Sequence, residues 1–205
     1  MPFTVDMLIM LTVSAIVACF YFGSAAAKLI LIGLAVSVGC DAAGTLLLKK
    51  EIALKDLSAV ITGLSVALVL PAGCPGWMAA LSAFTAVAVG KLPFGEHTKA
   101  PFVPAAVGTA FVTLLYPRIM FDYSAAAGAS FATGESLASM LRHANAVNLT
   151  GPALFNILAG NCPGAIGATC TFFFAACLVY LAVRKTDKFF IAAGFIAVCA
   201  LFAVL

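Results

Sequence analysis

Ser58 and Thr62 are the first residues whose types and spacing could do chemistry. They lie four positions apart, so a helix would place both hydroxyls on one face. Two interpretations are open, because small and hydroxylated residues let apolar helices pack closely and the same hydroxyls could line a ligand site. The segment ends at Leu70-Pro71, where the last carbonyl oxygens of a helix become available to another partner.

Asp41 is an ionisable residue within an apolar stretch of helical length. Such a residue is costly inside a membrane, so a functional role is one interpretation. The other is structural, because Lys49 and Lys50 follow about two helical turns later. Asp41 would then reach the membrane interface or pair with a lysine.

The stretch 91–104 carries a second group of ionisable residues, Lys91, Glu96, His97 and Lys99, between prolines. They fit either a solvated loop or a re-entrant segment between two short helices. His97 has no second ligand at the spacing that zinc requires. We therefore predict no metal site, no phosphate-binding loop and no catalytic side chain here.

Ser130 and Thr133 lie in a segment that includes Glu135 and is typical of a helix start. Serine or threonine caps the first turn, and an acidic side chain follows within it. Spacing alone does not make Thr133 an attachment site.

Cysteine spacing excludes a metal cluster, because none of the seven cysteines forms a Cys-x-x-Cys pair. Cys74 and Cys162 each precede Pro-Gly. A disulfide between these two loops is an alternative to free thiols.

Composition defines the fold class. Of 205 residues, 64% are hydrophobic and 9% are charged, and the mean hydropathy is +1.15, whereas soluble domains carry roughly a quarter of their residues as charges. We predict an all-α integral membrane protein in the lipid bilayer, with its first helix retained. The net charge of +3 is scattered over single residues, which excludes a nucleic-acid partner.

The apolar runs predict about seven transmembrane or partly spanning helices in one membrane domain, 1–205. The third to fifth are short and broken by prolines, which membranes tolerate only where protein or a cavity covers the freed backbone. The expected ranges are 7–22, 29–48, 57–71, 77–90, 102–116, 163–183 and 189–205.

Basic residues predict the orientation. Eight of the eleven lysines and arginines lie in three loops, 49–56, 91–101 and 184–188, which face one side if all seven segments cross. The positive-inside rule then places the N-terminus in the cytoplasm and the loop 117–160 outside. Because Leu205 ends an apolar run, we expect either a naturally short chain or a fragment.

Ordered matches along 56–108 carry a family resemblance. They resemble the Asp-x-Ser-Ala-x-x-Thr-Gly-Leu, Leu-Pro, Pro-x-Trp, Lys-x-x-Phe-Gly and Phe-x-Pro-Ala series of the RnfD/NqrB family. These are the membrane subunits of the Rnf ferredoxin:NAD+ oxidoreductase and of the sodium-pumping NADH:quinone reductase. The matching residues are Asp56, Ser58, Ala59, Thr62, Gly63, Leu64, Leu70, Pro71, Pro75, Trp77, Lys91, Phe94, Gly95, Phe102, Pro104 and Ala105. The stretch 160–169 resembles a further family signature.

The resemblance implies a cofactor and a site. The family carries FMN, attached through a phosphate ester to a threonine by a flavin transferase outside the cell. Thr133 is the matching position, preceded by Ser130. The residues implied to line the flavin or ion site are Ser58, Thr62, Lys91, Phe102 and Pro104.

The chain also departs from the family pattern. Ala127 stands where the family has an aspartate, Phe131 replaces a motif glycine, Val103 an asparagine and Ala168 a glutamate. The resemblance covers the first half and a little more of an inverted-repeat, urea-transporter-like fold, so we expect C-terminal truncation.

The function implied is that of a D-type component of a membrane electron-transport complex in the bacterial inner membrane. Such a component would relay electrons coupled to Na+ or H+ transport, together with other membrane and iron–sulfur subunits. The alternatives are a small-solute or flavin transporter of the same fold, and a non-functional fragment.

Overall fold

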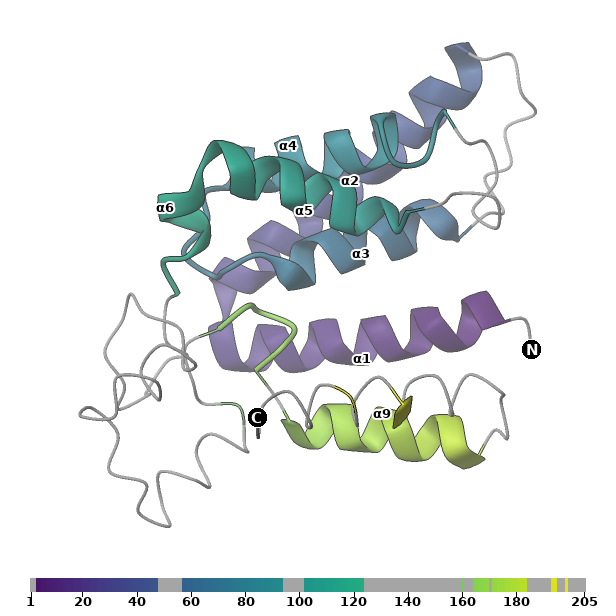
Figure 1. Ribbon diagram of the computed structural model, residues 1–205, viewed down its shortest axis with the longest axis vertical. Coiled ribbons are helices and arrows are strands. Elements are labelled where there is room, and N and C mark those ends of the chain that lie inside the picture. Colours follow the sequence, from purple (N-terminus) through teal and green to yellow (C-terminus); the bar gives the residue numbers. More distant parts are fainter. Residues whose placement is uncertain are drawn as a thin grey trace.

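The computed structural model describes residues 3–47, 57–93, 102–123, 160, 164–169, 171–183, 193, 194 and 198. Within these residues the chain is helical and forms no strand (Figure 1). The helices are α1 (Phe3–Phe22), α2 (Ser24–Leu47), α3 (Ser58–Val69), α4 (Gly76–Ala88), α5 (Pro104–Leu115), α6 (Pro117–Met120) and α9 (Thr171–Val183). The predicted all-α class therefore holds for the described residues. The last predicted helix, 189–205, lies almost wholly outside them.

Two helices, α1 and α2, are long and apolar enough to cross a membrane. Only 17% and 28% of their most apolar windows are buried inside the protein, whereas the core helix of a soluble protein would be mostly buried. Gly23 alone separates them, with a φ of 60° that glycine adopts without strain. The second helix thus begins at Ser24 instead of 29, because the exposed Lys28 is tolerated within its first turns.

The next three helices are short, as the prolines predicted. With 12, 13 and 12 residues, α3, α4 and α5 are each about 18–20 Å long, less than a hydrocarbon core of about 30 Å. Proline sets their limits: Pro71 follows α3, Pro75 precedes α4, and Pro104 is the first residue of α5. Because Pro104 fixes φ, α5 begins there and not at 102.

Small residues hold α2 against α3. A Cβ atom on Gly33 would lie 3.1 Å from the carbonyl oxygen of Gly63, and one on Gly63 would lie 2.9 Å from that of Gly33. The hydroxyl of Ser37 donates a hydrogen bond of 2.9 Å across the interface to the Ala59 carbonyl. This is the close small-residue packing that membrane helices use in place of a hydrophobic driving force.

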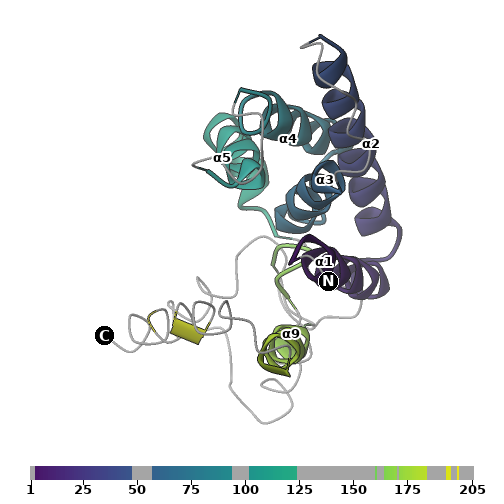
Figure 2. The same ribbon diagram turned by 90° about the vertical axis from the view of Figure 1, so that its right-hand side faces the viewer.

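The same packing joins α4 to α5. A Cβ on Gly108 would meet the Ser82 carbonyl oxygen, and it would lie 2.7 Å from the Cβ of Ala86. Viewed end on, α2 to α5 form one group with α1 and α9 beside it (Figure 2).

The segment 164–169 caps the broken end of α3. The backbone N–H of Ile166 donates to the Leu70 carbonyl at 3.1 Å, and that of Gly167 donates to the Leu68 carbonyl at 2.7 Å. The carbonyls expected to be available at Leu70-Pro71 are therefore used by a distant segment. This capping also corrects the helix predicted over 163–183, which begins only at Thr171, because 164–169 instead pairs with α3.

The described helix ends fall at two ends of the molecule. The last turns of α2 and α4 and the first turns of α3 and α5 meet at one end, here called the Lys91 end, where α1 begins and α9 stops (Figure 1). The antiparallel pairing of α1 and α9 includes a 3.1 Å hydrogen bond from the Tyr180 hydroxyl to Asp6 Oδ1. The opposite end, called the Tyr123 end, holds the α3–α4 turn and α6. The described helices next to the three basic loops, α2 to α5 and α9, reach the Lys91 end.

Candidate functional site

An ion pair between α2 and the turn after α4 is the main polar feature of the Lys91 end. Lys91 Nζ lies 2.7 Å from Asp41 Oδ1, and the two side chains expose only 11% and 17% of their surface. Asp41 therefore pairs with a lysine, as one interpretation predicted, and its partner among the described residues is Lys91. Lys49 and Lys50 lie outside the described residues. Charges taken this far out of water need such pairing.

The residues on either side of Lys91 fix its position. A Cβ on Gly90 would lie 2.8 Å from the Cα of Pro104, so glycine lets the end of α4 touch the start of α5. Leu92 covers Gly44 of α2, where an added Cβ would lie 3.0 Å from the Leu92 Cγ. Gly90 thus contacts α5, while Lys91 and Leu92 contact α2.

Four more of the predicted site residues, Ser58, Thr62, Phe102 and Pro104, lie at this same end. Ser58 and Thr62 are buried in the first turns of α3, and the Thr62 hydroxyl donates to the Ser58 carbonyl at 2.9 Å. Pro104 is buried against Gly90, whereas Phe102 is 64% exposed. The structure therefore brings Gly90, the neighbour of Lys91 in the chain, next to Pro104, while the Thr62 hydroxyl is engaged with the backbone of α3.

Ser130 and Thr133 lie outside the described residues. The chain leaves the described part at Tyr123, at the end opposite Lys91, ten positions before Thr133. That Thr133 carries FMN stays a prediction, as does the flavin or ion site that the residues at the Lys91 end were expected to line. Among the described residues, no group of three or more histidine, cysteine or acidic side chains could hold a metal ion.

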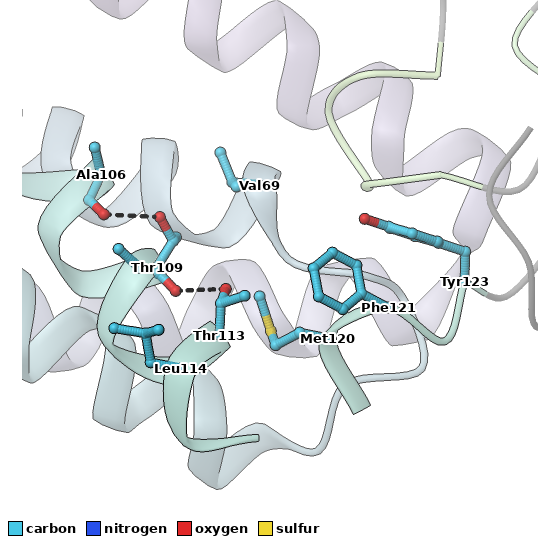
Figure 3. Close-up of a pocket in the computed structure, with 9 residues that line it drawn as sticks. Val69, Ala106, Thr109, Thr113, Leu114, Met120, Phe121 and Tyr123 are labelled. Atoms are coloured by element: carbon cyan, nitrogen blue, oxygen red, sulfur yellow. Dashed lines mark hydrogen bonds between the residues drawn. The ribbon is translucent and has the colours of Figure 1, made fainter. Parts of the chain in front are cut away.

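A cavity of about 440 Å³ lies at the Tyr123 end, and the motifs did not predict it (Figure 3). Thr109 and Thr113 of α5 line one wall of the cavity. The Thr109 hydroxyl donates to the Ala105 carbonyl at 3.0 Å, and the Thr113 hydroxyl donates to the Thr109 carbonyl at 2.7 Å. Their oxygens remain able to accept hydrogen bonds. The lining residues are Val69, Ala106, Thr109, Ala110, Thr113, Leu114, Met120, Phe121 and Tyr123.

Two signals in the sequence could have found these features. The four-residue spacings of Ala106 to Ala110 and of Thr109 to Thr113 mark a small and polar face of α5. Lys91 is a lone lysine at the end of an apolar helix, which favours a buried acidic partner.

Comparison with known proteins places the whole chain in one family. The model of the NQR2, RnfD, RnfE family matches residues 2–205. The D subunit of the proton-translocating ferredoxin:NAD(+) oxidoreductase complex of Clostridium ljungdahlii is 32% identical over 114 residues, 56% of this chain and 34% of that protein. The D subunit of the Na(+)-translocating ferredoxin:NAD(+) oxidoreductase complex of Acetobacterium woodii is 34% identical over 115 residues, 56% of this chain and 36% of that protein.

A relative from the second branch is also similar. The B subunit of the Na(+)-translocating NADH-quinone reductase of Ectopseudomonas mendocina is 31% identical over 137 residues, 65% of this chain and 34% of that protein. The matched regions thus span only about a third of each of these curated relatives. Because the family model extends over residues 2–205, the chain belongs to the NQR2, RnfD, RnfE family.

Proposed function

We propose that this chain is a D-type membrane component of an ion-translocating electron-transport complex of the Rnf type. The observation that carries the proposal is the family match over residues 2–205, together with relatives named as D subunits of proton- and sodium-translocating ferredoxin:NAD(+) oxidoreductase complexes. Its partners would be the other membrane and iron–sulfur subunits of such a complex.

The arrangement of helix ends supports a bacterial inner-membrane topology. The described helices next to the three basic loops reach the Lys91 end, and basic loops stay on the cytoplasmic side. The Lys91 end would then face the cytoplasm, and the Tyr123 end would face outward with the loop that bears Thr133. An inverted-repeat, urea-transporter-like fold is part of this proposal.

FMN on Thr133 would supply the redox chemistry, since flavins accept and donate electrons and proteins hold and tune them. The Thr133 hydroxyl would carry the phosphate ester, beside Ser130. The cavity at the Tyr123 end supports the proposal, because Phe121 and Tyr123 line it and the chain continues from there towards Thr133.

Covalent flavin is the direct test. The chain is produced with a bacterial flavin transferase, denatured in SDS and examined for in-gel flavin fluorescence. We expect a fluorescent band in the parent chain and in Thr150→Val, which removes another threonine hydroxyl from the same loop. Thr133→Val should abolish the band, because it removes only the attachment oxygen.

A parent chain without fluorescence would overturn the flavin-carrier function. Fluorescence that persists in Thr133→Val would show that the flavin is attached to another residue. Co-purification with neighbouring iron–sulfur subunits, expected for the parent and for Thr133→Val alike, tests membership of a complex separately from the flavin.

A further inference from the structure

We propose that Asp41 is the carboxylate of a monovalent-cation site at the Lys91 end, in which the ammonium group of Lys91 stands in for a sodium ion or a proton. The inference rests on the proposed role in ion translocation and assigns it a place in this chain. Lys91 Nζ already occupies the position of a bound cation, 2.7 Å from Asp41 Oδ1.

Few charges share the described part of this end with Asp41 and Lys91. Across residues 24–47, 57–93 and 102–115, the charged side chains are Lys28, Asp41 and Lys91 alone. Lys28 lies 13 positions before Asp41 on α2, about 20 Å along the helix. Within this described part, α3 and α5 bring no titratable side chain to Asp41, and Cys40 is its nearest titratable neighbour in sequence. If Lys91 withdraws, no other charged side chain of these described ranges replaces it, and a cation from solution could take its place.

The end of α4, which leads into Lys91, has carbonyl oxygens that could serve as further ligands. The N–H groups of Gly90, Lys91 and Leu92 bond back to the carbonyls of Ala86 and Val87. The next carbonyls, of Ala88, Val89 and Gly90, accept no hydrogen bond from a described residue. Free carbonyls and the negative end of the helix dipole favour a cation at this point, and carboxylate with carbonyl oxygens is the ligand chemistry of hard cations.

Lys91 can leave the site without a rearrangement of the backbone. Packing of Gly90 on Pro104 and of Leu92 on Gly44 fixes its neighbours, so the move requires only rotation of the flexible lysine stem. The Lys91 side chain is still 11% exposed, which gives it a route towards solvent. The Lys91 ammonium would then compete with a free cation for Asp41. Because one of the two is always bound, the Asp41 carboxylate would never be left charged and unpaired.

The test removes the tethered cation. The full chain is purified in detergent as wild type, Lys91→Met and the double variant Lys91→Met/Asp41→Asn, and thermal unfolding is followed in NaCl and in choline chloride of equal ionic strength. We expect sodium to stabilise Lys91→Met specifically. At a sodium concentration tenfold above the dissociation constant, its unfolding equilibrium constant should fall about elevenfold. The double variant should show no difference between the two salts.

A second arm identifies the cation. If acidification in choline chloride stabilises Lys91→Met relative to the double variant and sodium does not, the site takes a proton. Asp6→Asn in the Lys91→Met background is the matched control, because it removes another buried carboxylate and should leave the response intact. Lys28→Met should create no sodium response.

Equal responses of Lys91→Met and the double variant to sodium and to pH would overturn the site and leave a purely structural ion pair. If Lys91→Met does not fold, the binding of radioactive sodium to wild type and to Asp41→Asn is compared instead. We expect Asp41→Asn to lose the binding. Equal binding to both proteins would contradict the site. None of these measurements uses flavin or partner subunits, so they can succeed while the flavin test fails.

Discussion

The ion pair between Asp41 and Lys91 shows how single residues acquire their roles in this chain. Each was conspicuous alone, as a charge in or beside an apolar helix, yet 50 positions separate them. Their contact depends on Gly44 and Gly90, which let the end of α4 approach α2 and α5. Residue type thus marked the two candidates, while packing at the helix ends chose the partner.

Cys74, in the turn between α3 and α4, gives a residue-scale prediction. Burial raises the pKa of its thiol from 9.0 to about 11, so about 100-fold less thiolate is present near neutral pH than for an ordinary cysteine. We expect Cys74, as the only cysteine, to react with N-ethylmaleimide about 100-fold more slowly than an exposed thiol. The rate should rise about tenfold per pH unit up to the pKa.

Gly73→Cys in a Cys74→Ser background is the matched control, because position 73 is exposed in the same turn. Because the folded pKa is raised, Cys74 favours the fold fully below pH 9, and this contribution is lost as the pH rises towards 11. Equal labelling of the two thiols at neutral pH in the native protein would contradict the burial of Cys74.

At the scale of elements, close helix contacts depend on glycines. Gly33 and Gly63 face each other between α2 and α3, and Gly108 faces Ser82 and Ala86 between α4 and α5. The prolines set where the short helices begin and end, but the glycines decide how near these helices lie. Ser58 and Thr62 were open to two interpretations, and the hydrogen bond of Thr62 to its own helix favours packing.

Gly63→Ala should separate α2 from α3. The added methyl would meet the Ser37 hydroxyl and lie 2.9 Å from the Gly33 carbonyl oxygen. Overpacking of this kind costs about 1–3 kcal/mol. Thermal unfolding in detergent, or unfolding by SDS, would measure the loss of stability.

Gly39→Ala is the matched control on α2, because nothing lies within 4 Å of its added Cβ. That substitution should stabilise the helix by about 0.5–1 kcal/mol, since alanine loses less backbone entropy than glycine. Equal stability of the two alanine variants would show that α2 and α3 do not touch at Gly63.

At the scale of the whole molecule, the described helices arrange the chain between two unlike ends. The Lys91 end joins helices that flank basic loops, and the Tyr123 end holds the cavity and the segment 164–169 on α3. Ion exchange and flavin chemistry would therefore occupy opposite ends of the bundle. Coupling between them would run through α3 and α5, which extend from one end to the other.

Sidedness of these ends can be measured by labelling. Cysteines replace Leu57 and Phe102 at the Lys91 end, and Gly73 and Ile119 at the Tyr123 end, each in a cysteine-free chain; all four positions are exposed. We expect a membrane-impermeant maleimide to label positions 73 and 119 in intact cells and positions 57 and 102 only in inverted vesicles. Labelling of 57 and 73 from the same side would contradict the two-ended arrangement.

The sequence by itself determined the all-α class of the described residues, the short helices and the family, because apolar length, proline and ordered motifs act locally along the chain. It placed five candidate residues on the helix ends that meet near Lys91. Only the tertiary structure decided that Lys91 pairs with Asp41 and that a cavity forms beside α5. It also decided that the segment 164–169 caps α3, so that α9 begins only at Thr171. These contacts join residues far apart in sequence, so they depend on which helices pack together. Glycines allow two helices to approach closely, but a glycine in the sequence does not indicate which helix will be the partner.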